Sequence, residues 1–243
     1  PTKGLLLSIG ESIIYSDRLD VGYLIPIMFF KAYDHYSSRY NITGGANGQF
    51  FFQASSRNHL RNTHLYSTLF IDEIRLGSVF DKAKSRNQIG FNAGASITDI
   101  LIPYLTFGVE VTRTNPFVYR NLIPAQDYTN QSFPLADWLG SNADRLIAYA
   151  KYTPAPRLKL DLYLQRVRKG GESSLEDQYF SEPQPEFLNN LQSKGTQAQF
   201  GLSYEWIHNL VTNARLTTGQ DETVSTGIKE RYTHFAFSLK LGF

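Results

Sequence analysis

The sequence of 243 residues contains no cysteine and only one methionine. Without cysteine the chain can form neither disulfide bonds nor thiolate metal sites, and this composition suits an oxidising compartment such as the periplasm. No stretch approaches the roughly eighteen consecutive apolar residues of a membrane-spanning helix, so no such helix is predicted. The 24 basic residues nearly balance the 22 acidic ones and form no basic run, so we expect no nucleic acid partner.

The sequence also lacks the motifs that usually mark an active site. It contains no G-x-S-x-G, no H-E-x-x-H, no phosphate-binding glycine loop and no calcium-type Asp/Asn repeat. The adjacent Asp34 and His35 are the best candidate for half of a hydrolase site, but an exposed Asp–His pair in a long connection is more often solvated. We therefore expect a protein that is not an enzyme and that holds neither a cofactor nor a metal ion.

Aromatic residues, in contrast, make up 14% of the chain, and such residues favour β-strands. The last segment, "ERYTHFAFSLKLGF", switches between apolar and polar residues at almost every step. Because successive strand side chains point to opposite faces, the face with Phe235, Phe237, Leu239 and Leu241 is apolar. Such a strand fits either the edge of a soluble sandwich or a barrel in which this face contacts outer-membrane lipid. The terminal Phe243 resembles the signal by which the barrel-insertion machinery recognises bacterial outer-membrane barrels.

Alternation of this kind recurs and predicts ten strands, most of them near ten residues or longer. Strands of soluble sheets commonly have about five or six residues, whereas tilted strands that cross a bilayer need about nine to eleven. The predicted strands are residues 4–15, 42–54, 63–75, 87–98, 101–115, 143–153, 157–168, 194–206, 209–219 and 230–243.

Short and long connections alternate between these strands. The short segments "SSRNHLRN", "TDI", "TPAPR" and "IHN" alternate with the long connections 16–41, 76–86, 116–142, 169–193 and 220–229. Antiparallel strands that cross an outer membrane show this pattern, with short periplasmic turns and long outer loops. We therefore predict an all-β fold, an antiparallel transmembrane β-barrel, with residues 1–243 as a single domain that crosses the bacterial outer membrane several times.

A soluble β-sandwich is the alternative, and the charged residues disfavour it. Charges of both signs fall on the polar phase of the predicted strands, and burying so many of them in a dry core would be costly. In a barrel the same side chains can pair across strands and contact water. Besides Glu11 and Asp72, the charged residues predicted to line the lumen are Glu110, Arg145, Lys151, Lys159, Asp161, Glu205, Arg215 and Lys240.

The long connection 116–142 combines aromatic side chains with amides, carboxylates and an arginine. Aromatic faces stack on sugar rings and planar polar groups bond to hydroxyls, so this outer loop is the candidate glycan-binding surface. The alternatives are that the aromatics pack the loop onto itself, and that Trp138 anchors the chain at the membrane interface. The predicted glycan-binding residues are Tyr119, Arg120, Asp127, Tyr128, Asn130 and Trp138.

One apolar segment, "DVGYLIPIMFFKAYDHY", lies inside a predicted outer loop and shows no two-residue period. Water penalises the exposure of so many neighbouring apolar side chains. We therefore expect this segment to fold back against the mouth of the barrel as a short helix or a hydrophobic turn.

The segments "GESIIYSDR", "YLIPIMFF", "LYSTLFIDEI" and "LGSNADRLIAY" follow one another in an order that resembles the capsule assembly Wzi-like family of outer-membrane barrels. In that family a G-E-x-x-I/V-Y strand leads into a Y-L-x-P-x-x-F segment and then into a strand close to L-Y-x-x-x-x-I-D-D. The matching residues are Gly10, Glu11, Tyr15, Tyr23, Leu24, Pro26, Phe29, Leu65, Tyr66, Ile71 and Asp72, with Glu73 in place of the second acidic residue.

The resemblance implies a barrel of more than ten strands, of which this chain is expected to be the C-terminal part. It also implies a role in capsule assembly or attachment, with surface polysaccharide as the partner. A general porin or solute channel is the second function to be considered, and an outer-membrane hydrolase is the third.

Overall fold

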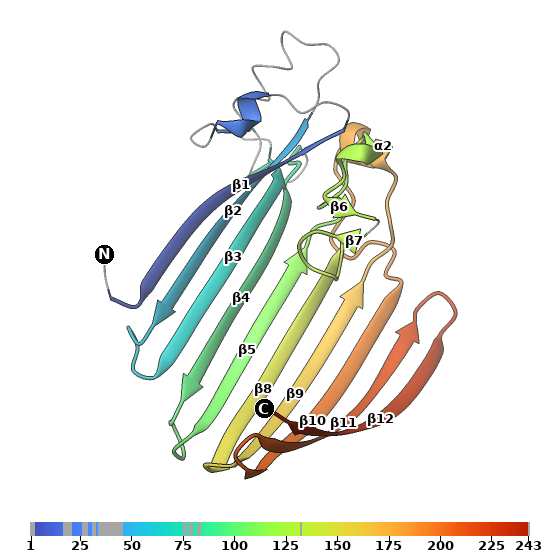
Figure 1. Ribbon diagram of the computed structural model, residues 1–243. Coiled ribbons are helices and arrows are strands. Elements are labelled where there is room, and N and C mark those ends of the chain that lie inside the picture. The colour runs from blue at the N-terminus through green and yellow to red at the C-terminus, as the bar shows by residue number, and fades with distance from the viewer. Residues whose placement is uncertain are drawn as a thin grey trace.

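The main feature of the computed structural model is a ten-stranded antiparallel sheet (Figure 1). The structure describes residues 3–16, 21–25, 29–30, 33, 46–74, 77, 80–81, 84–131 and 133–242. The strands of the sheet are β1 (Leu5–Tyr15), β2 (Ala46–Arg57), β3 (Thr63–Glu73), β4 (Gln88–Thr98), β5 (Leu105–Thr114), β8 (Ala143–Ala155), β9 (Leu158–Lys169), β10 (Ser193–Ile207), β11 (Leu210–Thr223) and β12 (Ile228–Leu241). They follow one another in this order across the sheet. In the described part of the chain, β1 and β12 are edges that do not pair with each other.

All ten predicted strands are present, and the antiparallel all-β architecture is confirmed. Differences at the strand ends have a local cause in the turns. β2 continues past its predicted end because Asn58 and Asn62 adopt positive φ angles of 60° and 57°, which confine the turn to residues 58–62. β5 begins later than predicted because Asp99 and Tyr104 also take positive φ angles, and the Asp99 carboxylate accepts a hydrogen bond from the Tyr104 N–H. Residues 42–45 of the second predicted strand lie outside the described residues.

The connections gather at the two ends of the sheet (Figure 1). The strand ends joined by the long connections 16–45, 74–87, 115–142 and 170–192 lie at one end of the sheet, and the short turns 58–62, 99–104, 156–157 and 208–209 lie at the other. The prediction of a long connection at 220–229 is wrong. Both flanking strands extend towards each other and leave a turn of residues 224–227, in which Gly227 has a φ of 66°. The alternation therefore holds for the first four loops and ends at the last hairpin.

The strand register divides the side chains between two faces of the sheet. The face that we call inner carries, as direct neighbours on β3, β4, β5, β8 and β9, the residues Tyr66, Gly94, Glu110, Ile147 and Gln165. The opposite face, called outer, carries in the next row Leu65, Ala95, Val109, Ala148 and Leu164. The sheet is curled, and in Figure 1 the end of β12 comes in front of the neighbouring strands.

Burial is reversed relative to a soluble sheet. Apolar side chains of the outer face are exposed, with Ile9 at 72% and Phe235 at 70%. The residues buried on the inner side are largely polar, among them Gln49, Asp72 and Gln88. A water-soluble β-sandwich packs its apolar faces together and keeps its charges outside, so this distribution disfavours that alternative and is typical of a transmembrane barrel wall.

The apolar segment between β1 and β2 is described only in part. Its residues Val21–Leu24 form the 3-10 helix η1, and the ring of Tyr23 meets those of Phe30 and Tyr33 edge-on, with centroids 5.9 and 5.1 Å apart. The Phe30 N–H donates a 2.7 Å hydrogen bond to the carboxylate of Glu11 on β1. The segment thus contains the predicted short helix, and it is tied to β1. Among the helices that the structure describes, none is long and apolar enough to cross a membrane.

Candidate functional site

The loop between β5 and β8, residues 115–142, is anchored to the inner face of β2 and β3 by Asp72. This carboxylate is only 4% exposed, and its Oδ2 accepts a hydrogen bond from the backbone N–H of Tyr119 at 2.7 Å. The side-chain amides of Asn47 and Gln49 donate to its Oδ1 at 3.3 and 3.4 Å. Asn47 also donates to the backbone carbonyl of Gln126 in the 3-10 helix η3 (Pro124–Gln126). Because buried polar groups need partners, these bonds fix the position of the loop against the inner face of the sheet.

A small aromatic cluster lies beside this anchor. Phe70 on β3 is 9% exposed, and its ring centroid lies 5.3 Å from that of Tyr119 and 5.2 Å from that of Tyr128. Val118 is fully buried in the same cluster, and Phe51 packs against it. The loop is therefore held to the inner face both by hydrogen bonds and by the burial of apolar side chains.

The second long loop, residues 170–192, is joined to the first through Asn142. This side chain is 2% exposed, and its amide donates to the carbonyl of Gly171 and to Oδ1 of Asn189, both at 2.8 Å. Its own Oδ1 accepts a hydrogen bond from the Leu188 N–H at 2.8 Å. The loop contains the short helix α2 (Leu175–Phe180), and the first loop contains the hairpin β6 (Thr129–Asn130) and β7 (Phe133–Pro134); Figure 1 shows these elements at the same end of the sheet. The two loops therefore form one unit at this end of the sheet.

A cluster of charges connects the first loop to the centre of the inner face. The guanidinium of Arg145 on β8 lies 3.3 Å from the carboxylate of Glu110 on β5 and 3.4 Å from that of Asp137 in the loop. The hydroxyl of Tyr66 donates to the second oxygen of Glu110 at 2.5 Å. The ring of Trp138, which is 63% exposed, lies 5.7 Å from the Arg145 guanidinium. This cluster therefore combines a paired cation with an accessible aromatic ring.

Tyrosine rings cover the inner face below this cluster. A Cβ atom at Gly94 would collide with the ring of Tyr66, and one at Gly108 would collide with the ring of Tyr149. Both rings therefore lie flat on the wall, over a neighbouring strand that has no side chain at that position. Tyr163 is stacked beside Tyr149 at a centroid distance of 5.7 Å. The result is a smooth aromatic surface on the inner face between β3 and β9.

A basic side chain borders this aromatic surface. The ammonium of Lys151 lies 5.1 and 5.6 Å from the ring centroids of Tyr149 and Tyr163. Cations at such distances are attracted by the ring faces. Lys151 and its cross-strand neighbour Asp161 occupy the next inner row towards the short turns. The inner face thus presents rings and both signs of charge within a few rows.

The pH dependence of loop attachment provides a test of this arrangement. Burial raises the pKa of the Tyr119 phenol to about 12, against an ordinary value of 10.0. Below pH 10 the phenol is neutral in the folded and the unfolded chain, so its contribution to stability is fully present. Between pH 10 and 12 only the unfolded chain ionises, so up to about 2–3 kcal/mol is lost.

We expect the melting temperature of the parent protein to fall between pH 10 and 12 by more than that of Tyr119→Phe. The control is Tyr104→Phe, which removes an exposed phenol at the opposite end of the sheet and should follow the parent. Equal pH profiles for all three proteins would contradict the assigned burial of Tyr119.

The predicted glycan-binding residues do not form one surface. Tyr119 is 5% exposed and stacks on Tyr128 at 6.0 Å inside the aromatic cluster, so its prediction as a stacking platform is wrong. Packing of the loop onto itself, the alternative, is what the structure shows for these two rings. Arg120 donates a 2.8 Å hydrogen bond to the carbonyl of Ser173 in the neighbouring loop.

The other predicted glycan-binding residues differ in exposure. Asp127 accepts a 2.6 Å hydrogen bond from the Asn121 N–H; burial raises the pKa of Asp127, and that hydrogen bond acts in the opposite direction. Asn130 and Trp138 are exposed. Arg120, Asp127 and Tyr128 are half-buried, so Asn130 and Trp138 are the most accessible of the six residues to a glycan.

The strand register places the predicted lumen charges on one face. All eight, from Glu110 to Lys240, fall on the inner face. Glu11, also expected on the polar phase, is an exception. Glu11 pairs with Phe50 and lies on the same face of β1 as Ile9, where its carboxylate accepts a hydrogen bond from the Phe30 N–H. That prediction was wrong because the segment beyond β1 supplies a hydrogen-bond partner for an outward-facing carboxylate.

Several other candidates remain untested. Asp34, His35 and the terminal Phe243 lie outside the described residues. Among the residues that the structure describes, no group of three or more His, Asp or Glu side chains is arranged to hold a metal ion.

Sequence reasoning missed the roles of three kinds of residue. It placed Asp72 on the polar phase without assigning the loop anchor, and it overlooked Asn142 and the pairing of tyrosines with cross-strand glycines. The alternation pattern gives the face of a residue, but only the strand register gives its neighbours.

Comparison with known proteins supports the fold. No protein-family model and no curated protein sequence matches the chain. The crystal structure of the outer membrane channel DcaP of Acinetobacter baumannii is similar over 100% of this chain, with a TM-score of 0.54 and 9% sequence identity. This chain spans 60% of the length of that channel chain. The resemblance to the Wzi-like family stays a prediction, and the antiparallel β-barrel fold predicted from the sequence is confirmed.

Proposed function

We propose that this chain forms the wall and the constriction of a solute channel in a bacterial outer membrane. The reversed burial carries the proposal: apolar side chains are exposed on the outer face, while the loop 115–142 is fixed to a polar inner face. A loop held in this way narrows the space that the inner face encloses. The similarity to an outer membrane channel supports the same reading, although at 9% identity it concerns the fold alone.

The inner face also has the chemistry of a solute pathway. Flat tyrosine rings provide contact area with little loss of side-chain entropy, because they are already fixed over Gly94 and Gly108. Arg145 and Glu110 on one side and Lys151 on the other provide charges of both signs. Such a surface favours small polar solutes that carry a ring or a charge.

Surface polysaccharide binding is the second candidate function. The exposed ring of Trp138 beside the guanidinium of Arg145 favours it, since an accessible aromatic face next to a hydrogen-bond donor suits a sugar ring. This reading retains the capsule-assembly role that the Wzi-like resemblance implies. In this case the glycan would bind at the end of the sheet that carries the long loops, and no pore would be needed.

Conductance in planar lipid bilayers separates the two candidates. As a channel, the full-length native protein should produce discrete conductance steps, and Arg145→Gln should shift its ion selectivity because Glu110 and Asp137 would lose their counter-ion. Lys3→Gln is the matched control, since it removes one exposed positive charge that precedes β1 and is not part of the sheet. A protein that inserts but never conducts would contradict the channel, and retention of purified surface polysaccharide that is lost in Trp138→Ala would then favour the second candidate.

A further inference from the structure

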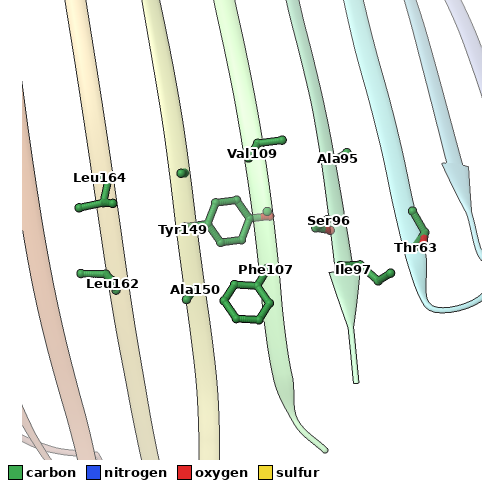
Figure 2. Close-up of a pocket in the computed structure, with 12 residues that line it drawn as sticks. Thr63, Ala95, Ser96, Ile97, Phe107, Val109, Tyr149, Ala150, Leu162 and Leu164 are labelled. Atoms are coloured by element: carbon green, nitrogen blue, oxygen red, sulfur yellow. The ribbon is translucent and has the colours of Figure 1, made fainter. Parts of the chain in front are cut away.

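Two adjoining hollows lie on the outer face of the sheet. The first has a volume of about 440 Å³ and is a trough with small side chains at its floor, Ala148 and Ala150 on β8. Its sides are formed by Phe107 on β5 and by Leu162 and Leu164 on β9 (Figure 2). Figure 2 also shows the ring of Tyr149 among these residues, but its register assigns it to the inner face. The trough is therefore lined mainly by apolar side chains.

The second hollow has a volume of about 710 Å³ and shares Ala148 and Leu164 with the first. It differs in its polar rim. Arg166, Thr196, Gln220 and Arg231 line it, and the register makes them successive neighbours on β9, β10, β11 and β12. This row lies on the outer face, one outer position beyond Leu164 towards the long loops. Two outer positions on a strand are about 7 Å apart, so the cations border the apolar trough directly.

The arginines of this rim carry no carboxylate partner in the described structure. Arg166 is exposed and has no ion pair, while Arg231 donates from Nε to the side-chain oxygen of Gln220 at 2.9 Å. Arg168, two residues further along β9, shows the contrast, because Asp144 pairs with it through two hydrogen bonds. Two guanidiniums on the outer face without a carboxylate partner are available to an anion from outside the chain.

We propose that this outer-face groove binds an anionic phospholipid, with its phosphate between Arg166 and Arg231 and an acyl chain in the trough along Ala148 and Ala150. Arginine matches phosphate geometry, and Thr196 and Gln220 add hydrogen-bonding groups in the same row. An apolar trough that ends at two cations matches the two halves of a lipid and no water-soluble anion. The proposal depends on the membrane location given under Proposed function, but not on conduction.

Lipid selectivity tests this proposal. The native protein is exchanged into detergent micelles that contain equal amounts of phosphatidylglycerol and phosphatidylcholine, and the lipids that remain bound are measured by native mass spectrometry. The parent protein should retain phosphatidylglycerol preferentially. In the double variant Arg166→Gln/Arg231→Gln this preference should fall at least about tenfold, since both charge-assisted contacts to the phosphate are removed.

Two further variants make the test specific. Lys3→Gln/Arg57→Gln removes two exposed positive charges beside β1 and at the end of β2, far from the groove, and should keep the parent preference. Ala148→Phe fills the floor shared by both hollows and should reduce retention of both lipids without changing the preference between them. An equal loss in both double variants, or a parent protein without preference, would overturn the proposal.

The lipid test is independent of the proposed channel. Conductance of each variant is recorded in bilayers of phosphatidylcholine, where the groove has no anionic ligand. A protein that selects the anionic lipid but does not conduct would disprove the channel alone, whereas one that conducts without selecting the lipid would disprove the groove alone.

Discussion

Replacement of Asp72 by alanine is expected to detach the loop 115–142 and to lower the free energy of unfolding by on the order of 3–5 kcal/mol. The carboxylate is buried and accepts hydrogen bonds from Asn47, Gln49 and the Tyr119 N–H. Alanine leaves these donors in a buried place without their acceptor. In the proposed channel, release of the loop widens the constriction, so the single-channel conductance should rise.

The variant is examined by thermal unfolding, by limited proteolysis of the loop and by conductance. Asp221→Ala is the matched control, because that carboxylate lies on the inner face of β11 but is exposed, and it should leave all three properties near those of the parent. Asp72→Ala with parental stability and an uncut loop would show that Asp72 is not the anchor.

An arginine in place of Leu216 should destabilise the protein in a membrane by about 2–4 kcal/mol, whereas one in place of Thr217 should be tolerated. Leu216 lies in the middle of β11, is 45% exposed and belongs to the outer face with Phe235 and Phe200. Thr217 faces inward beside His234. The cost arises because a cation at the lipid face loses its hydration, while the inner face remains wet.

The natural sequence supplies a precedent on the same strand, since Arg215 already lies on the inner face beside Gly201. Unfolding in lipid vesicles with increasing urea gives the free energies for both variants. The assignment of the two faces would be wrong if Thr217→Arg proved as costly as Leu216→Arg. A further comparison in detergent should show a smaller difference, because detergent adapts to the altered surface.

The loop is held to the wall near both of its ends, which has a consequence for the proposed channel. Asp72 holds the loop near its start, and Arg145 holds it near its end through Asp137. The first contact is buried, while the Arg145 and Asp137 side chains are 13% and 23% exposed. Loss of the first therefore affects stability most, and loss of the second affects the charge that a passing solute meets.

The alternation of apolar and polar residues was sufficient to predict all ten strands, because one face of this wall is largely apolar and the other largely polar. Errors arose where a local conformation overrides the pattern. Positive φ angles at Asn58 and Asp99 shift the turns, and Glu11 lies on the outer face because it bonds to the Phe30 N–H. A pattern with period two contains no information about such partners.

By itself, then, the sequence determined the class of fold, the number of strands in the described sheet and the inward phase of charges such as Glu110 and Lys151. Each depends on one residue and its neighbours along the chain. Only the tertiary structure decided that Tyr119 is buried against Phe70, that Asp72 anchors a loop beginning 43 residues later, and that Arg166 and Arg231 share one row. These relations depend on strand register and on loop folding, which bring together residues that are far apart in sequence.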